Sequence, residues 1–197
     1  ALELYREALE IFEQIGNPLG QARNIGNIGV VYYDQGEWEK ALELYREALE
    51  IFEQIGNPLG QARNIGNIGV VHYDQGELEE ALKHYQEALA IHKEIGNPLG
   101  QAQDLGNIGL VYAEQGNLEQ ALEHYWEALA LHKKIGGPLG QADQLANIGI
   151  VYARQGKKKK ALDMLNQARK IFLDIGATGE GLQNIEDNIK MLSQEDP

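Results

Sequence analysis

A six-residue segment with the sequence Ile-Gly-Asn-Pro-Leu-Gly, seen at residues 55–60, constrains this chain more than any other feature. It occurs four times at intervals of forty residues, and only Gly137 departs from it. Gly56 suits the left-handed conformation just past a helix end, whereas Asn57 suits an N-cap and Pro58 suits the first turn of the next helix. Such a corner at a fixed spacing predicts stacked helical hairpins.

Each period is expected to contain two helices, one from about Pro18 to Gln35 and one from about Trp38 to Ile55. In each helix, apolar residues recur at three- and four-residue steps, which is the pattern of one buried stripe. The charged residues of the second helix lie opposite its stripe and indicate a solvated outer face. The stripe residues are Ala22, Ile25, Ile28, Gly29 and Tyr32 in the first helix and Ala41, Leu42, Tyr45, Ala48, Leu49 and Phe52 in the second.

Two glycines, Gly26 and Gly29, lie inside the first helix, where each costs about 1 kcal/mol relative to alanine. Their recurrence in later copies requires a compensating gain, and a close approach of the paired helices is the simplest one. We expect Gly29 to face the small side chains of Ala41 and Ala48. A phosphate-binding loop is disfavoured, because no strand precedes these glycines and no Gly-Lys-Ser/Thr follows them.

The repeat pattern resembles that of a known family, the tetratricopeptide repeat (TPR). The residues that carry the resemblance are Ile25-x-x-Ile28-Gly29-x-x-Tyr32, followed by Gly36, Ala41, Tyr45, Ala48 and Leu49. Family members usually have Trp where Ile25 stands and Pro after the second helix, and their repeat is commonly about 34 residues long. The forty-residue form, with Asn-Ile-Gly inside its first helix, is similar to the repeats of Pins-type polarity adaptors, kinesin light chain, bacterial peptide-sensing regulators and the tails of some bacterial signalling ATPases.

The resemblance covers residues 1 to about 176 and implies an all-α, right-handed α-solenoid of TPR helix-turn-helix repeats. A leading helix, four hairpins and a terminal helix would follow one another along the chain. We expect a single solenoid domain over residues 1–197. Its repeat boundaries are expected near residues 17, 57, 97, 137 and 177.

The two ends of the chain are expected to differ. The leading helix, Ala1–Ile15, has no first helix before it, so its outer side is expected to be uncapped. Residues 178–197 are expected to form a terminal capping helix, with Thr178 as its N-cap. In this helix Glu186 and Lys190 replace the small and apolar residues of the repeats, which is typical of a solvated cap.

The bulk composition disfavours several classes of function. The formal net charge is −13 and the isoelectric point about 4.8, which argues against nucleic acids and anionic membranes as partners. Thr178 and Ser193 are the only threonine and serine, and cysteine is absent, so we expect no enzyme activity and no cofactor. Repeat-equivalent histidines such as His84 and His124 are expected to lie too far apart to share a metal ion. We expect a cytoplasmic protein without a membrane span.

One asparagine recurs at the same place in every first helix. The resemblance implies that it faces the concave groove and hydrogen-bonds the backbone of an extended peptide. An amide both donates and accepts, and Asn forms helices poorly, so its recurrence in mid-helix needs a reason. A bond to a neighbouring helix, or repetition by duplication alone, stays an alternative. The four candidate peptide-binding residues are Asn27, Asn67, Asn107 and Asn147.

Arg23 and Arg63 stand one turn before the first two of these asparagines and share their helix face. Each guanidinium is suited to a bidentate contact with a carboxylate of the ligand. Gln103 and then Asp143 take the arginine position in later copies, which predicts a groove that is basic first and neutral to acidic later. Ordinary surface ion pairs of the arginines stay an alternative.

A further pair of recurring positions completes the expected groove. Tyr33 and Tyr73 are expected to serve as aromatic anchors for the peptide, and Asp34 and Asp74 are expected to line the groove beside them. Packing between helices is the alternative role for the tyrosines.

We therefore expect a non-enzymatic interaction module that holds an extended peptide, or a partner's helix, in its concave groove. A self-assembling array is the first alternative, with homo-oligomers formed through the uncapped helix at residues 1–15. Such an array would be natural or engineered, since residues 1–40 and 41–80 differ at three positions only. A regulatory segment of a larger signalling protein is the second alternative.

Overall fold

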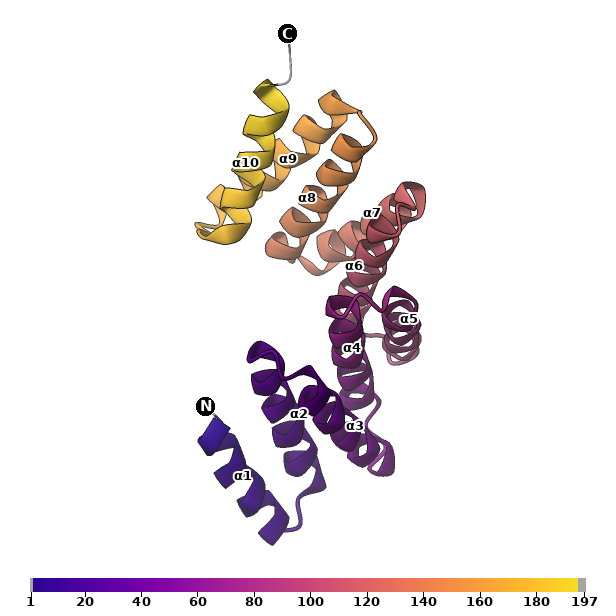
Figure 1. Cartoon of the computed structure of the whole chain (residues 1–197), viewed down its shortest axis with the longest axis vertical. Helices are drawn as coiled ribbons and strands as arrows, with labels where there is room; N and C mark the ends of the chain where they lie inside the picture. The colour runs from indigo at the N-terminus through magenta and orange to yellow at the C-terminus, as the bar shows by residue number, and fades with distance from the viewer. Residues whose placement is uncertain (1, 195–197) are drawn as a thin grey trace. The chain divides into compact units, whose positions relative to one another are not determined.

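The computed structural model describes residues 2–194, which form ten α-helices and no strand. The chain divides into two compact units, residues 1–97 (unit 1) and residues 98–197 (unit 2). Consecutive helices lie side by side within each unit (Figure 1). Unit 1 contains α1 (Leu2–Gln14), α2 (Pro18–Asp34), α3 (Trp38–Gln54), α4 (Pro58–Asp74) and α5 (Leu78–Glu94), and unit 2 contains α6 (Pro98–Glu114), α7 (Leu118–Ile135), α8 (Pro138–Arg154), α9 (Lys158–Asp174) and α10 (Glu180–Gln194).

The expected corner is confirmed in detail between α3 and α4. Gly56 has a φ of +64°, a conformation that glycine adopts without strain. The Asn57 side chain accepts a hydrogen bond from the backbone N–H of Gly60 at 2.8 Å, and Pro58 is the first helical residue. Gly137, which replaces the asparagine before α8, makes no side-chain cap. Local residue chemistry thus starts and ends these helices where the sequence predicts.

The core of each unit lies between its helices. In unit 1, Ala41 and Tyr45 of α3 pack with Ile68 and Val71 of α4, and all four side chains are buried. In unit 2, Leu165 of α9 belongs to the hydrophobic core and is fully buried. The all-α fold of helix-turn-helix repeats, with a leading helix, four hairpins and a terminal helix, is confirmed.

The expected neighbours of Gly29 were wrong. A Cβ built on Gly29 would lie 2.7 Å from Cε1 of Tyr45 and 3.4 Å from Cβ of Leu44, so the tyrosine ring rather than an alanine lies over this glycine. Ala48 lies instead near the other glycine, since a Cβ built on Gly26 would be 3.9 Å from its Cβ. Gly69 lies against Tyr85 in the same way, with its built Cβ 2.8 Å from the ring. The glycine therefore makes room for a buried aromatic ring.

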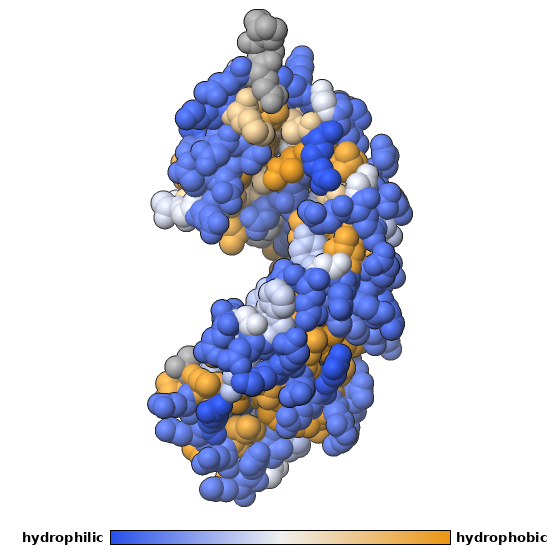
Figure 2. Space-filling view, viewed as in Figure 1, coloured by the Kyte–Doolittle hydropathy of each residue, from blue (hydrophilic) through white to orange (hydrophobic). Residues whose placement is uncertain are grey.

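The first helix, α1, is less buried than the other helices. No residue of α1 is buried, and Leu4, Ile11 and Ile15 at the N-terminal end are 70%, 56% and 65% exposed. Apolar residues accordingly reach the surface over α1 (Figure 2). Ala1 lies outside the described residues.

The start of α10 differs by one residue from the prediction. The first helical hydrogen bond runs from the N–H of Gln183 to the carbonyl of Gly179, so Gly179 rather than Thr178 occupies the N-cap position. The helix is described from Glu180 to Gln194, and the last three residues of the expected cap lie outside the described residues.

Candidate functional site

Four of the candidate peptide-binding residues line one hollow in unit 1. This unit-1 hollow lies between the first helices α2 and α4, and its empty volume is about 260 Å³ with the mouth included. Arg23 and Arg63 are exposed at its rim, and Asn27 and Asn67 are half-buried one turn further along their helices. The repeat spacing therefore brings two guanidinium groups and two amides to one place.

Neither arginine of the unit-1 hollow has a partner of opposite charge in the part of the chain that the structure describes. The ion pairs there involve other cations, such as Lys40 with Glu37 and Arg169 with Glu186. Arg23 and Arg63 are therefore available to a bound anion, although the protein as a whole is acidic.

A buried amide that the sequence analysis missed, Asn64, also lines the unit-1 hollow. Its Nδ2 donates to the carbonyl of Gly60 at 2.9 Å, which fixes the orientation of the amide. Its Oδ1 is buried and has no hydrogen-bond partner among residues 2–194. A Cβ built on Gly26 would lie 3.1 Å from this oxygen, so the glycine leaves room for the amide.

A signal for this amide was present in the sequence. The buried position carries a polar residue in all four first helices, although it lies four residues before a core isoleucine and hence on the apolar face. A polar residue on a buried face needs a hydrogen-bonding reason. The four residues are Asn24, Asn64, Asp104 and Gln144, each no more than 9% exposed.

The expected aromatic anchor Tyr33 is engaged within the fold. Its hydroxyl donates a hydrogen bond to the carboxylate of Asp74, on the next first helix. Burial, and then this bond and the charge of Asp74, raise the pKa of Tyr33 to about 12. Asp34, the last residue of α2, is exposed, and Tyr73 is half-buried near the end of α4. None of these four residues lines the unit-1 hollow.

A larger hollow lies in unit 2 between α8 and α10. This unit-2 hollow has an empty volume of about 650 Å³, mouth included. Asp143 and Asn147 of α8 line it, opposite Asn184 and Asn188 of α10. Asn107, at the same register in α6, is half-buried and lines neither hollow. The recurring asparagines therefore line both hollows. Arginines lie beside them in the unit-1 hollow, and an aspartate lies beside Asn147 in the unit-2 hollow.

The unit-2 hollow differs from the unit-1 hollow at the position of the buried amide. In unit 1 the amide of Asn64 fills the space over Gly26, but in unit 2 the equivalent pair is Asn184 and Ala146. Ala146 stands where unit 1 has Gly26, and Asn184 is exposed whereas Asn64 is buried. The volume that is filled in unit 1 is therefore left open in unit 2.

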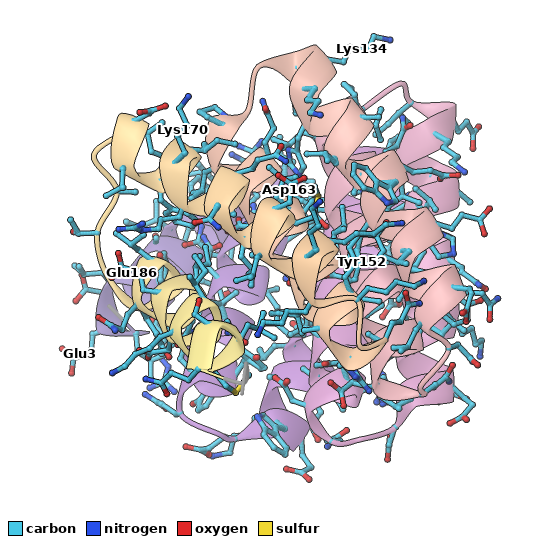
Figure 3. The ribbon with its side chains drawn as sticks, turned by 90° about the horizontal axis from the view of Figure 1, so that it is seen from above. Glu3, Lys134, Tyr152, Asp163, Lys170 and Glu186 are labelled. Atoms are coloured by element: carbon cyan, nitrogen blue, oxygen red, sulfur yellow. The ribbon has the colours of Figure 1, made fainter. Side chains whose placement is uncertain are left out.

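Other charged and aromatic groups were compared with the requirements of metal and membrane binding. No group of three or more His, Asp or Glu side chains within residues 2–194 is arranged to hold a metal ion. Residues 157–160 are four consecutive lysines, and Lys157 and Lys160 lie 5.8 and 5.4 Å from the ring centroid of Tyr152, which Figure 3 labels. These lysines therefore contact a tyrosine face by cation–π interaction. None of the helices described is long and apolar enough to cross a membrane.

Comparison with known proteins agrees with this architecture. The family model described as tetratricopeptide repeat matches residues 1–54, 58–134 and 100–174. BtubC (BKLC) from P. vanneervenii is similar in structure, with a TM-score of 0.83 and 20% identity over 97% of this chain and 81% of that chain. The apo form of RapI is also similar, with a TM-score of 0.78 and 22% identity over 98% of this chain and 76% of that one. At these identities the likeness shows the fold alone. No curated protein sequence matches the chain.

Proposed function

Because this chain belongs to the tetratricopeptide repeat family, we propose that it is a non-enzymatic interaction module that binds an extended peptide segment of a partner protein. The peptide would lie along the first helices, on the concave side of the expected solenoid. A partner's helix laid along the same side is the related alternative. Repeats of this family serve as protein-interaction scaffolds, and the part specific to this chain is the set of groups that would hold the ligand.

The observation that carries the proposal is the composition of the unit-1 hollow. The Oδ1 of Asn64 is buried in the wall of the hollow without a partner among residues 2–194, and such acceptors cost free energy, so a small movement of this amide toward a ligand donor would be favoured. Asn27 and Asn67 stand beside it with groups that both donate and accept. A peptide backbone supplies alternating N–H and C=O groups, which match such a set whatever the side chains of the peptide are.

The two arginines add a charge preference to the proposed site. Arg23 and Arg63 are exposed at the rim and have no ion-pair partner within residues 2–194. A carboxylate of the ligand would therefore not have to displace an internal partner before pairing with a guanidinium. We expect the segment bound over unit 1 to carry an acidic residue.

The direct test is peptide display on the whole chain followed by calorimetry with a selected peptide. Replacing Arg63 by Gln is expected to weaken binding about tenfold, because it removes a charged contact, and Asn67→Ala is expected to weaken it by a similar factor. Arg46→Gln, an equally exposed arginine on α3 away from the hollow, is the matched control and should leave the affinity unchanged. Circular dichroism would verify that each variant keeps its helices.

Two results would count against the proposal. One is the failure of display to recover any peptide that binds the chain. The other is an affinity that neither Arg63→Gln nor Asn67→Ala changes while helicity stays intact.

A specific observation keeps self-association as a second candidate function. The outer side of α1 exposes Leu4 and Ile11, whereas the equivalent residues of α3, Leu44 and Ile51, are half-buried. Stacking of α1 on α10 of another copy in the manner of the repeats is sterically opposed, because Ile189 occupies the position of Gly29.

A two-fold contact of α1 with α1 does not meet this obstacle. Sedimentation at several concentrations would test it, with Leu4→Glu/Ile11→Glu as the variant expected to be monomeric throughout. A wild-type chain that stays monomeric at high concentration would remove this candidate.

A further inference from the structure

The unit-2 hollow differs from the unit-1 hollow in shape as well as in charge. Its floor is formed by Leu165 and Phe172 of α9 and Ile185 of α10, and all three side chains are buried. Ile150 of α8 forms part of the wall and remains exposed. An apolar floor below an open mouth is suited to the aliphatic part of a ligand side chain.

The rim of the unit-2 hollow is rich in acceptors. Asp143 contributes a carboxylate. The Nδ2 of Asn188 donates to the carbonyl of Asn184 at 2.8 Å. The Oδ1 of this amide is therefore the atom that can accept a hydrogen bond from a ligand. The amides of Asn147 and Asn184 lie beside these two groups and are able to accept as well. No cationic side chain lines this hollow.

Two cations of α9 and α10 line a different surface. Arg169 and Lys190 line a separate hollow together with Glu186 and Ile189, and the guanidinium of Arg169 donates to Glu186 at 3.0 Å. Figure 3 labels Glu186 on α10. The residues of α10 that line the unit-2 hollow fall on another face of the helix, at steps of three and four residues. Within residues 2–194, the ionisable group that acts on Asp143 is His132 of α7, whose own pKa is lowered by burial.

We infer that the unit-2 hollow is a binding subsite for a lysine or arginine side chain of the partner peptide. The aliphatic stem would lie on the apolar floor, and the positive group at its tip would pair with Asp143 and donate a hydrogen bond to the Oδ1 of Asn188. This subsite rests on the proposed peptide-binding function and specifies the chemistry of one ligand residue.

The environment of Asp143 supports the assignment. Although this residue is exposed, neighbouring atoms desolvate its carboxyl and raise its pKa, while His132 acts in the opposite direction. A carboxylate that has lost part of its hydration gains more from a cation at contact distance than a fully hydrated one does. Binding of a lysine or arginine side chain would therefore lower this pKa.

The experiment uses the whole chain and capped single residues as probes, so it does not depend on knowing the partner. N-acetyl-lysine amide, N-acetyl-arginine amide, N-acetyl-norleucine amide and N-acetyl-glutamate amide would be titrated while NMR follows the side-chain amides of Asn147, Asn184 and Asn188. The lysine and arginine probes are expected to shift these signals in a saturable way. The norleucine probe should bind more weakly, because it has the stem without the charge, and the glutamate probe should not bind.

One variant and its control test the role of the Asp143 charge. Asp143→Asn keeps the size of the side chain. It is expected to lower the affinity for the lysine probe about fivefold and to leave the affinity for the norleucine probe unchanged. Asp163→Asn is the matched control, since Asp163 is exposed on α9, as labelled in Figure 3, and does not line the hollow. Equal binding of all four probes, or an Asp143→Asn variant that binds the lysine probe as wild type does, would overturn the inference.

The same experiment distinguishes the two proposals. Saturable binding of the lysine probe with no recoverable peptide would support the subsite while removing the peptide-binding function. Peptides that bind through unit 1 while the probes leave unit 2 unshifted would overturn the subsite alone.

Discussion

The hydroxyl of Tyr33 donates a hydrogen bond to the carboxylate of Asp74, joining the first helices of two successive repeats. Each residue stands near the C-terminal end of its helix, Tyr33 on α2 and Asp74 on α4. Because the tyrosine is already bonded within the fold, it contributes to holding α2 and α4 on either side of the unit-1 hollow. A peptide would therefore meet two helices already held in place, which lowers the cost of ordering them on binding.

This bond predicts how Tyr33 titrates. Its pKa is raised from 10.0 to about 12, first by burial and then by the bond to Asp74 and the charge of Asp74. Asp74→Asn should lower the pKa of Tyr33 while leaving it above 10, because burial remains. Asp34→Asn is the control and should change it less, since Asp34 contributes least. NMR of the ring protons would follow the titration, and equal shifts in the two variants would contradict the assignment.

The packing of Tyr45 over Gly29 predicts an unusual response to alanine. In an ordinary helix Gly→Ala gains about 1 kcal/mol, but here the new Cβ would lie 2.7 Å from a buried ring, and overpacking of that kind costs about 1 to 3 kcal/mol. Gly29→Ala should therefore lower the free energy of unfolding by about 1 kcal/mol. In a Tyr45→Ala background the same change should raise it, because the ring is gone. Urea denaturation of the four proteins measures the coupling, and additive effects would refute the packing argument.

The parts of the fold that follow from local chemistry were predictable from the sequence. The corner at residues 55–60 fixes its own geometry, because Gly56 supplies the left-handed residue and Asn57 supplies the cap. The helix bounds follow from these signals to within about one residue. The grouping of Arg23 and Asn27 on one helix face also follows from spacing alone.

The parts that depend on how neighbouring helices fit together were not predictable in the same way. Gly29 was expected to contact alanines, but the space above it holds the ring of Tyr45, and sequence spacing does not state how far apart two helices lie. The partner of Tyr33 and the buried amide of Asn64 likewise depend on contacts between successive repeats. A polar residue repeated on a buried face was the one available signal for Asn64.

The capping asparagines give a prediction with opposite signs at two equivalent corners. Asn57→Ala should cost about 1 kcal/mol of stability, because the N–H of Gly60 loses its acceptor at 2.8 Å. Gly137→Asn should gain about 0.5 kcal/mol, since this corner has no side-chain cap and its φ of −95° suits any residue. The nearest atom to the new Cβ is Nδ1 of His132 at 3.3 Å.

The equivalent corner at residues 95–100 shows that an asparagine next to this histidine is tolerated. There Asn97 donates its N–H to the carbonyl of His92, so an asparagine and a histidine occupy the same two positions. Thermal unfolding of both variants against wild type measures the effects. Loss of stability in Gly137→Asn would show that the contact with His132 outweighs the cap.

The stacked rings of His72 and His84 predict a pH dependence of stability. Their centroids are 5.3 Å apart and their planes differ by 7°. Burial, and then the charge of His72, lower the pKa of His84 below 6.5. A histidine that binds its proton less readily when folded makes stability fall as pH drops from about 6.5 through the lowered pKa. Urea midpoints should therefore be lower at pH 5 than at pH 7.5.

Unit 2 supplies the natural control for this pair. There Tyr112 stacks on His124 with ring centroids 5.4 Å apart, so a neutral ring takes the place of a second histidine. His72→Tyr is expected to keep the stack, raise the pKa of His84 towards 6.5 without reaching it, and reduce the loss of stability between pH 7.5 and 5. Part of that loss should remain, because burial also lowers the pKa of His132. NMR titration of the imidazole Hε1 signals reports each histidine separately. An unchanged His84 pKa in the variant would mean that burial alone sets it and that the charge of His72 has no part in it.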